Sequence, residues 1–146
     1  MTSGTDQSTR FEFATATRIV FGAGRLDEVG REARAMGRQA LVVTGRATER
    51  AASLLELLAA QEIGTRSFTV TSEPTTDVVH RGTECARESG CDLVIGFGGG
   101  SILDTGKAIA ALLTNDGDPL DYLEVIGGGQ PLARPPLPYI AIPTTA

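Results

Sequence analysis

The sequence has few of the residues on which metal sites, disulfide frameworks and histidine-dependent catalysis rely. Its 146 residues contain no tryptophan, one histidine and two cysteines. The single histidine, His80, excludes a site with several histidine ligands, and its neighbours predict a solvated or helix-capping side chain. Cys85 and Cys91 do not make a disulfide framework or a metal site, so we expect two reduced thiols. We therefore assign neither a catalytic residue nor a metal ligand to the chain.

Long apolar runs and excess positive charge are also missing. No run reaches the roughly 18 apolar residues of a transmembrane helix. The formal net charge of −5 argues against non-specific binding to nucleic acid. Residues 1–10 are polar and lack the apolar core of a secretory signal, so we expect a disordered tail and a cytoplasmic protein. Hydrophobic residues make up 41% of the sequence, which suits one domain over residues 11–146.

Apolar residues in the rest of the chain alternate between strand-like and helix-like patterns. The predicted strands are residues 11–21 (one or two strands, or a hairpin), 40–44, 66–70, 92–97 and 139–142; the predicted helices are residues 25–36, 47–61, 76–89 with Thr76 as N-cap, 101–113 and 119–126. This alternation indicates an α/β fold: a Rossmann-like, mainly parallel sheet with helices on both faces, plus an N-terminal β-hairpin.

Four loops are expected at one edge of this sheet, because the carboxyl ends of parallel strands meet there. They are residues 44–46, 71–75, 97–101 and 143–146. Ligands of open parallel sheets bind at this edge, near the point where the strand order reverses. The sequence therefore predicts a nucleotide groove.

The most informative segment is DLVIGFGGGSILDTGK, residues 92–107. An apolar run is followed by three glycines and then by a segment with helical spacing. A glycine loop that leads into a helix holds phosphate, because glycine lets the backbone approach the anion and the first N–H groups of the helix point at it. Ser101 and Asp104 also fit S-x-x-D, a capping pattern that binds nothing, and this alternative stays open. Neither the standard Rossmann nor the Walker glycine pattern is present.

Four segments resemble, in order, motifs of the iron-containing (group III) alcohol dehydrogenases. They are IVFGAGRLDEVG (19–30), SEPTTDVV (72–79), GGGSILDTGKAIA (98–110) and LPYIAIPTTA (137–146). The resemblance implies the α/β domain that binds NAD or NADP and serves hydride transfer between an alcohol and an aldehyde. The family's helical domain, which holds iron or zinc on an aspartate and histidines, has no counterpart here. We therefore expect an isolated cofactor domain that is not catalytic alone.

The resemblance also implies which residues bind the cofactor. The glycine loop and Ser101 would hold the pyrophosphate, and Asp104 would lie near the nicotinamide. Lys107 either pairs with Asp104 or only shapes the groove. Glu73 stands where relatives often have an amide, which leaves its role open. The full predicted set is Gly45, Arg46, Glu73, Gly98, Gly99, Gly100, Ser101, Asp104, Lys107, Thr144 and Thr145.

The residues that follow the strand at 40–44 bear on the choice between NAD and NADP. NAD-preferring relatives often carry an aspartate there, which accepts a hydrogen bond from the adenosine ribose and repels the extra phosphate of NADP. Here the pair is Gly45 and Arg46, with no carboxylate and an available guanidinium. We therefore hypothesise that the site tolerates or prefers NADP(H); the alternative is that Arg46 is a solvated turn residue.

Two other functions remain open. The chain could be a non-catalytic nucleotide-binding or self-associating module, with a homodimer formed through the strands at 11–21. It could also be the cofactor domain of a glycerol dehydrogenase-like enzyme, which has a similar domain.

Overall fold

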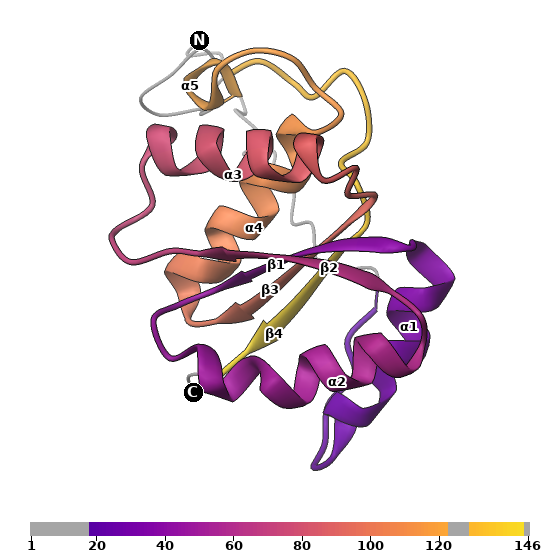
Figure 1. Ribbon diagram of the computed structural model, residues 1–146. Helices are drawn as coiled ribbons and strands as arrows, with labels where there is room; N and C mark the ends of the chain where they lie inside the picture. The colour runs from indigo at the N-terminus through magenta and orange to yellow at the C-terminus, as the bar shows by residue number, and fades with distance from the viewer. Residues whose placement is uncertain (1–17, 123–128, 145–146) are drawn as a thin grey trace, which may run out of the picture.

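Four parallel strands form the centre of the molecule. The computed structural model describes residues 18–122 and 129–144. The strands are β1 (Gln39–Thr44), β2 (Gly64–Thr69), β3 (Leu93–Gly98) and β4 (Tyr139–Pro143). Their order in the sheet is β2-β1-β3-β4, and every neighbouring pair is parallel. The mainly parallel α/β fold expected from the sequence is confirmed (Figure 1).

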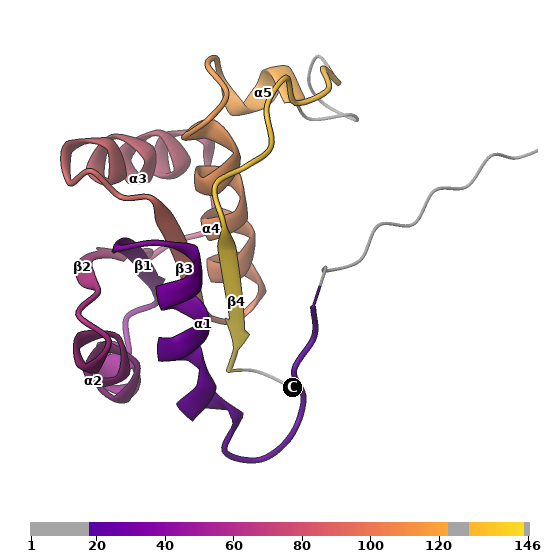
Figure 2. The same ribbon diagram turned by 90° about the vertical axis from the view of Figure 1, so that its right-hand side faces the viewer.

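Helices cover both faces of the sheet. Their bounds are α1 (Val29–Met36), α2 (Ala52–Ala60), α3 (Thr76–Glu88), α4 (Gly100–Leu112) and α5 (Pro119–Tyr122), with short 3-10 helices η1 (Arg25–Glu28) and η2 (Thr48–Ala51) before α1 and α2. One hydrophobic cluster joins α3 and α4 to one face, and a second joins α1 and α2 to the other. The two layers are visible in Figures 1 and 2.

The residues of β1 explain why helices are needed on both sides. Leu41 and Val43 belong to the cluster with α3 and α4, whereas Ala40 and Val42 belong to the cluster with α1 and α2. All four are fully buried. A strand buried on both faces reads as a continuous apolar run, and a fully buried Leu or Val contributes about 1.5–3 kcal/mol.

The ends of α3 show how local chemistry sets helix boundaries. The N-cap is Thr75, not the predicted Thr76, because Thr75 has an extended backbone and its hydroxyl accepts from the Val78 N–H at 3.2 Å. Thr76 is the first helical residue. At the other end, Gly90 takes a left-handed φ of 63° that suits glycine, and the helix stops before it.

The predicted strand over residues 11–21 is wrong in the part that is described, since residues 18–21 form no strand. Ile19 is 75% exposed and Phe21 is 95% exposed. β-propensity reflects how well a side chain packs on a pleated sheet. Because no described strand pairs with residues 18–21, their β-branched and aromatic side chains are not sufficient to form a strand. Residues 1–17, which include the predicted tail and the rest of the predicted hairpin, lie outside the described residues.

Several predicted boundaries also shift. β2 covers residues 64–69 instead of 66–70, and the first turn of the predicted helix at 47–61 is the 3-10 helix η2. α5 ends at Tyr122, while residues 123–126 of its predicted range lie outside the described residues. None of these shifts changes the order of the elements.

Candidate functional site

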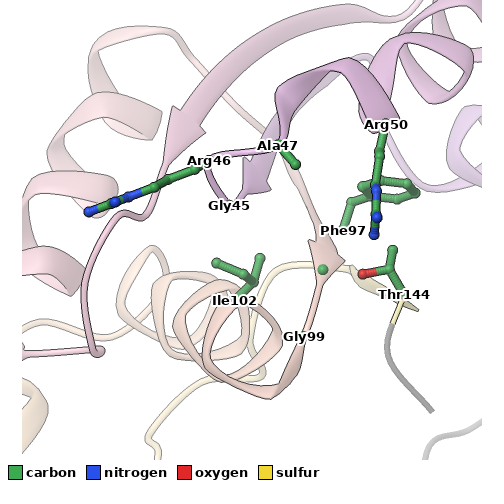
Figure 3. Close-up of a pocket in the computed structure, with 9 residues that line it drawn as sticks. Gly45, Arg46, Ala47, Arg50, Phe97, Gly99, Ile102 and Thr144 are labelled. Carbon is green, nitrogen blue, oxygen red and sulfur yellow. The ribbon is translucent and has the colours of Figure 1, made fainter.

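A hollow of about 160 Å³ lies at the point where the strand order reverses. β1 and β3 are neighbours, but the chain leaves β1 toward α2 on one face and leaves β3 toward α4 on the other. The edge between them therefore stays open, as expected for a parallel sheet. We call this space the switch-point hollow; its lining is Gly45, Arg46, Ala47 and Arg50 from the β1–α2 connection, Phe97, Gly98, Gly99 and Ile102 from β3 and α4, and Thr144 after β4 (Figure 3).

The glycine loop begins α4 without help from any side chain. Gly99 is the N-cap, and its carbonyl accepts from the N–H groups of Ile102 and Leu103 at 3.0 Å each. Ser101 is the second residue of the helix and does not cap it, so the capping-box alternative is wrong. Within the described residues, the N–H groups of Gly100 and Ser101 have no acceptor. They are donors at the positive end of a 13-residue helix, where anions bind.

The glycines near this hollow differ in what a side chain would contact at each position. A Cβ added at Gly98 would lie 2.8 Å from Ile102 Cγ1, so α4 could not pack as it does. A Cβ added at Gly100 would meet nothing within 4 Å. Among the described residues, no contact requires glycine at this position, which leaves space there for a ligand. At Gly45 a Cβ would be 3.7 Å from Ile102 Cδ1, an ordinary contact, so packing does not forbid a side chain there.

The two arginines of the β1–α2 connection point in different directions. The Arg46 guanidinium donates to the Thr71 carbonyl at 3.1 Å and points away from the hollow (Figure 3). Arg50 points into the hollow, toward the side where Phe97 and Thr144 lie. Arg50 is not among the residues predicted from the sequence to bind the cofactor. Its position one helical turn after Arg46, at the start of the predicted helix, is the signal that could have identified it.

Other predicted residues lie away from the switch-point hollow. Glu73 is exposed in the loop between β2 and α3. Asp104 borders a second hollow of about 220 Å³ between α3 and α4, which is also lined by Val79 and Pro119. Lys107 is exposed on α4, and among the described residues no ion pair joins it to Asp104. Thr145 lies outside the described residues.

Thr144 is held at the edge of the hollow by its backbone. Its N–H donates to the Gly98 carbonyl at 3.0 Å, which extends the pairing of β3 and β4 by one residue. Thr44 ends β1 and is only 4% exposed, and its Oγ1 has no hydrogen-bond partner in the described part of the chain. Such an unpaired buried hydroxyl costs about 1–3 kcal/mol and is unusual next to a packed core.

Tyr139 holds the first turn of α4 against the sheet. Its Oη donates to the Leu103 carbonyl at 2.7 Å. Burial, and then the charge of Asp104, raise the pKa of Tyr139 well above its usual range. The hydroxyl therefore stays protonated and keeps this hydrogen bond at physiological pH.

The histidine and the cysteines lie outside both hollows. His80 Nε2 is 3.2 Å from Asp118 Oδ2, and Asp118 Oδ1 accepts from the Leu120 N–H at the start of α5. Cys85 and Cys91 are free thiols. In the described ranges, no three His, Cys, Asp or Glu side chains gather as a metal site would require. Nor does any helix there have the length and apolar character to cross a membrane.

Comparison with known proteins shows similarity over almost the whole chain. The family model for iron-containing alcohol dehydrogenase matches residues 16–146. The sulfoacetaldehyde reductase of Bilophila wadsworthia is 36% identical over 141 residues, which cover 93% of this chain and 35% of that protein. The chain thus spans about a third of the length of such relatives.

Solved structures show the same similarity. The NADH-dependent butanol dehydrogenase A of Thermotoga maritima matches with a TM-score of 0.80 and 27% identity, covering 94% of this chain and 35% of that one. The sulfoacetaldehyde reductase of Bifidobacterium kashiwanohense, in complex with NAD+, matches with a TM-score of 0.75 and 28% identity, covering 93% and 36%.

Proposed function

The chain belongs to the iron-containing alcohol dehydrogenase family, and on this premise we propose that residues 11–146 form its dinucleotide-binding domain. The ligand would be NAD or NADP. The nicotinamide would supply the hydride chemistry between an alcohol and an aldehyde. The residues of this chain would bind and orient that cofactor.

The observation that carries the proposal is the open N-terminus of α4 beside the switch-point hollow. The N–H groups of Gly100 and Ser101 have no acceptor in the described part of the chain. We propose that they donate to the pyrophosphate while Gly98 and Gly99 let it approach the backbone. The family's NAD+ complex named above supports this ligand class. The hollow of about 160 Å³ is smaller than typical ligand pockets of about 300–1,000 Å³, so the dinucleotide would extend beyond it.

The remaining predicted residues would serve the rest of the cofactor. Asp104 borders the second hollow, along α4 from the glycine loop, which fits the proposed place for the nicotinamide end. Thr144 borders the switch-point hollow and would contact the nucleotide with Thr145. Lys107 would shape the groove, because it has no ion pair with Asp104 in the described residues. Glu73 would flank the cofactor from the loop after β2.

The described residues do not fit the family's metal. They contain no cluster of possible metal ligands, and the sequence has only one histidine, which lies beside Asp118. We therefore derive no step through iron or zinc. We expect the 146-residue chain alone to bind the cofactor without oxidising an alcohol, and we expect chelation by EDTA to leave cofactor binding unchanged.

Two glycine variants separate cofactor binding from folding. We would titrate NAD+ and NADP+ into the 146-residue chain by calorimetry. Gly100→Ala is expected to stabilise the fold by up to about 1 kcal/mol, because glycine is poor in a helix, yet to weaken both cofactors about tenfold by blocking backbone approach. Gly98→Ala is expected to destabilise the fold by about 1–3 kcal/mol through contact with Ile102.

Two outcomes would count against the proposal. If the unchanged chain binds neither cofactor, the proposed function is wrong. If Gly100→Ala binds both as tightly as the unchanged chain, the glycine loop does not hold the pyrophosphate.

We also propose that the chain forms a homodimer through its N-terminal segment. Ile19 and Phe21 are large apolar side chains that are 75% and 95% exposed. Arg18 is fixed to α1 by an ion pair with Glu32 at 2.6 Å, which holds the segment at the surface. Exposed apolar side chains that lie together favour association.

A further inference from the structure

We propose that Arg50, and not Arg46, contacts the 2′-phosphate of NADP(H) and makes this chain prefer the phosphorylated cofactor. The inference rests on the proposed function, because it requires a dinucleotide in the switch-point hollow. It assigns a specificity residue that the sequence pattern did not identify.

The two walls of the hollow come from different parts of the chain. One wall is the glycine loop with the free N–H groups at the start of α4, where the pyrophosphate would sit. The other wall is the connection from β1 to α2, which carries Arg46 and Arg50. If the pyrophosphate lies at the glycine loop and its nucleoside enters the hollow, the ribose of that nucleoside lies against the second wall. Arg50 is the side chain that points from it into the space (Figure 3).

The charges around the hollow favour an anion at that wall. None of its lining residues is acidic. Arg46 is already engaged with the Thr71 carbonyl at 3.1 Å, whereas the Arg50 guanidinium has no hydrogen bond or ion pair in the described residues. A guanidinium has five N–H donors in a planar fork that matches phosphate oxygens. A phosphate monoester carries about −1.5 to −2 charges at pH 7, so it gains most from this partner.

Gly45 also favours a phosphate at this wall. A Cβ there would make only an ordinary 3.7 Å contact with Ile102, so the fold permits an aspartate at this position. A carboxylate at this wall would neutralise Arg50 and repel a phosphate. Without that carboxylate, Arg50 has no ion pair with any of the described residues. The Thermotoga relative is named as NADH-dependent, and the preference proposed here differs from that name.

The test compares the affinities for NADP+ and NAD+ in four variants of the 146-residue chain. Arg50→Gln is expected to weaken NADP+ by about 10- to 100-fold, the usual loss of a charge-assisted hydrogen bond, and to change NAD+ by less than about threefold. Gly45→Asp is expected to produce the same selective loss. Arg46→Gln tests whether Arg46 contacts the 2′-phosphate instead. Arg31→Gln removes the same charge from an exposed site on α1, which does not border the hollow, and should change neither affinity.

A second measurement follows the phosphate itself. In ³¹P NMR, Arg50 should lower the pKa of the bound 2′-phosphate from about 6, and Arg50→Gln should abolish this shift. The inference is overturned if Arg46→Gln carries the selective loss, if Arg50→Gln weakens NAD+ and NADP+ equally, or if Gly45→Asp is selective while Arg50→Gln is not. If the unchanged chain binds neither cofactor, the proposed function itself has failed, which is a separate result.

Discussion

Arg46 and Arg50 stand one helical turn apart in sequence, yet only Arg50 turns its guanidinium toward the switch-point hollow. The difference comes from a contact that is remote in sequence, because the Thr71 carbonyl after β2 holds Arg46. The reactivity of a cysteine thiol likewise depends on the residues packed around it. Cys85 and Cys91 are both free thiols, but Cys91 is enclosed enough for burial to disfavour its thiolate.

At this scale we predict that Cys91 resists alkylation. Burial, and then the nearby Cys85, raise the pKa of Cys91 to about 11. An unfolded thiol has a pKa near about 8.5, so at pH 8 the native Cys91 should react with iodoacetamide about a hundredfold more slowly than in urea-unfolded protein. Because the pKa is raised on folding, the protonated thiol's contribution to stability is present below about pH 8.5 and is lost as pH rises toward 11.

Peptide mapping by mass spectrometry measures the rate at Cys91 alone, with the urea-unfolded chain as control. Equal rates in the native and unfolded chains at pH 8 would contradict the prediction.

At the scale of elements, α4 is the helix that brings the sheet and the site together. It packs on β3 and β4, and its first turn carries the donors that face the proposed pyrophosphate. Tyr139 of β4 fixes this turn through the Leu103 carbonyl. The ring fits because Gly96 of β3 and Gly106 of α4 lack side chains: a Cβ at Gly106 would lie 2.9 Å from Tyr139 Cε2, and one at Gly96 would collide with Tyr139 Oη.

We predict that Gly96 and Tyr139 are energetically coupled. Gly96→Ala should lower the free energy of unfolding by about 1–3 kcal/mol, because the added methyl group collides with the tyrosine hydroxyl. Tyr139→Phe should lower it by about 1 kcal/mol through loss of the hydrogen bond to Leu103. The double variant should lose less than the sum by about 1 kcal/mol, because removing the hydroxyl also removes the collision.

Urea unfolding monitored by circular dichroism measures all four chains of this cycle. The matched control combines Gly100→Ala with Tyr139→Phe. Their effects on the free energy of unfolding should be additive, because a Cβ at Gly100 meets none of the described residues within 4 Å. Additivity of the Gly96 cycle within about 0.5 kcal/mol would show that the two residues do not collide.

At the scale of the whole molecule, the described residues form one sheet with two helical layers and one open edge that carries the candidate site. β1 and β3 are enclosed on both faces, while β2 and β4 are the outer strands. Among the described residues, few large apolar side chains are exposed, and two of them, Ile19 and Phe21, are two residues apart in the sequence. This segment is the apolar surface that we expect the proposed homodimer to bury.

We therefore predict that Phe21 contributes to self-association. Phe21→Ser should weaken dimer formation by about tenfold or more, because burying a phenylalanine side chain contributes about 1.5–3 kcal/mol. Sedimentation velocity over a range of concentrations gives the dissociation constant. Leu120→Ser, at an α5 residue that is 41% exposed, is the control and should have no effect. A strictly monomeric unchanged chain would exclude the proposed dimer.

Local pattern was sufficient to predict the alternating elements and the loop that carries the glycines. Buried strands such as 40–44 and 92–97 are recognisable because enclosure on both faces selects uninterrupted apolar residues. The glycine loop is recognisable because three consecutive glycines stand between a strand pattern and a helical pattern. These properties depend on neighbours in sequence, so the sequence by itself determined them.

The tertiary structure decided what depends on contacts between distant segments. The order β2-β1-β3-β4 sets the β1–α2 connection beside the glycine loop and makes a single hollow from two separate parts of the chain. The same contacts turned Arg46 outward, left Arg50 inward and kept residues 18–21 out of the sheet. Strand pairing and side-chain direction minimise the free energy of the whole chain, so no local pattern could have fixed them.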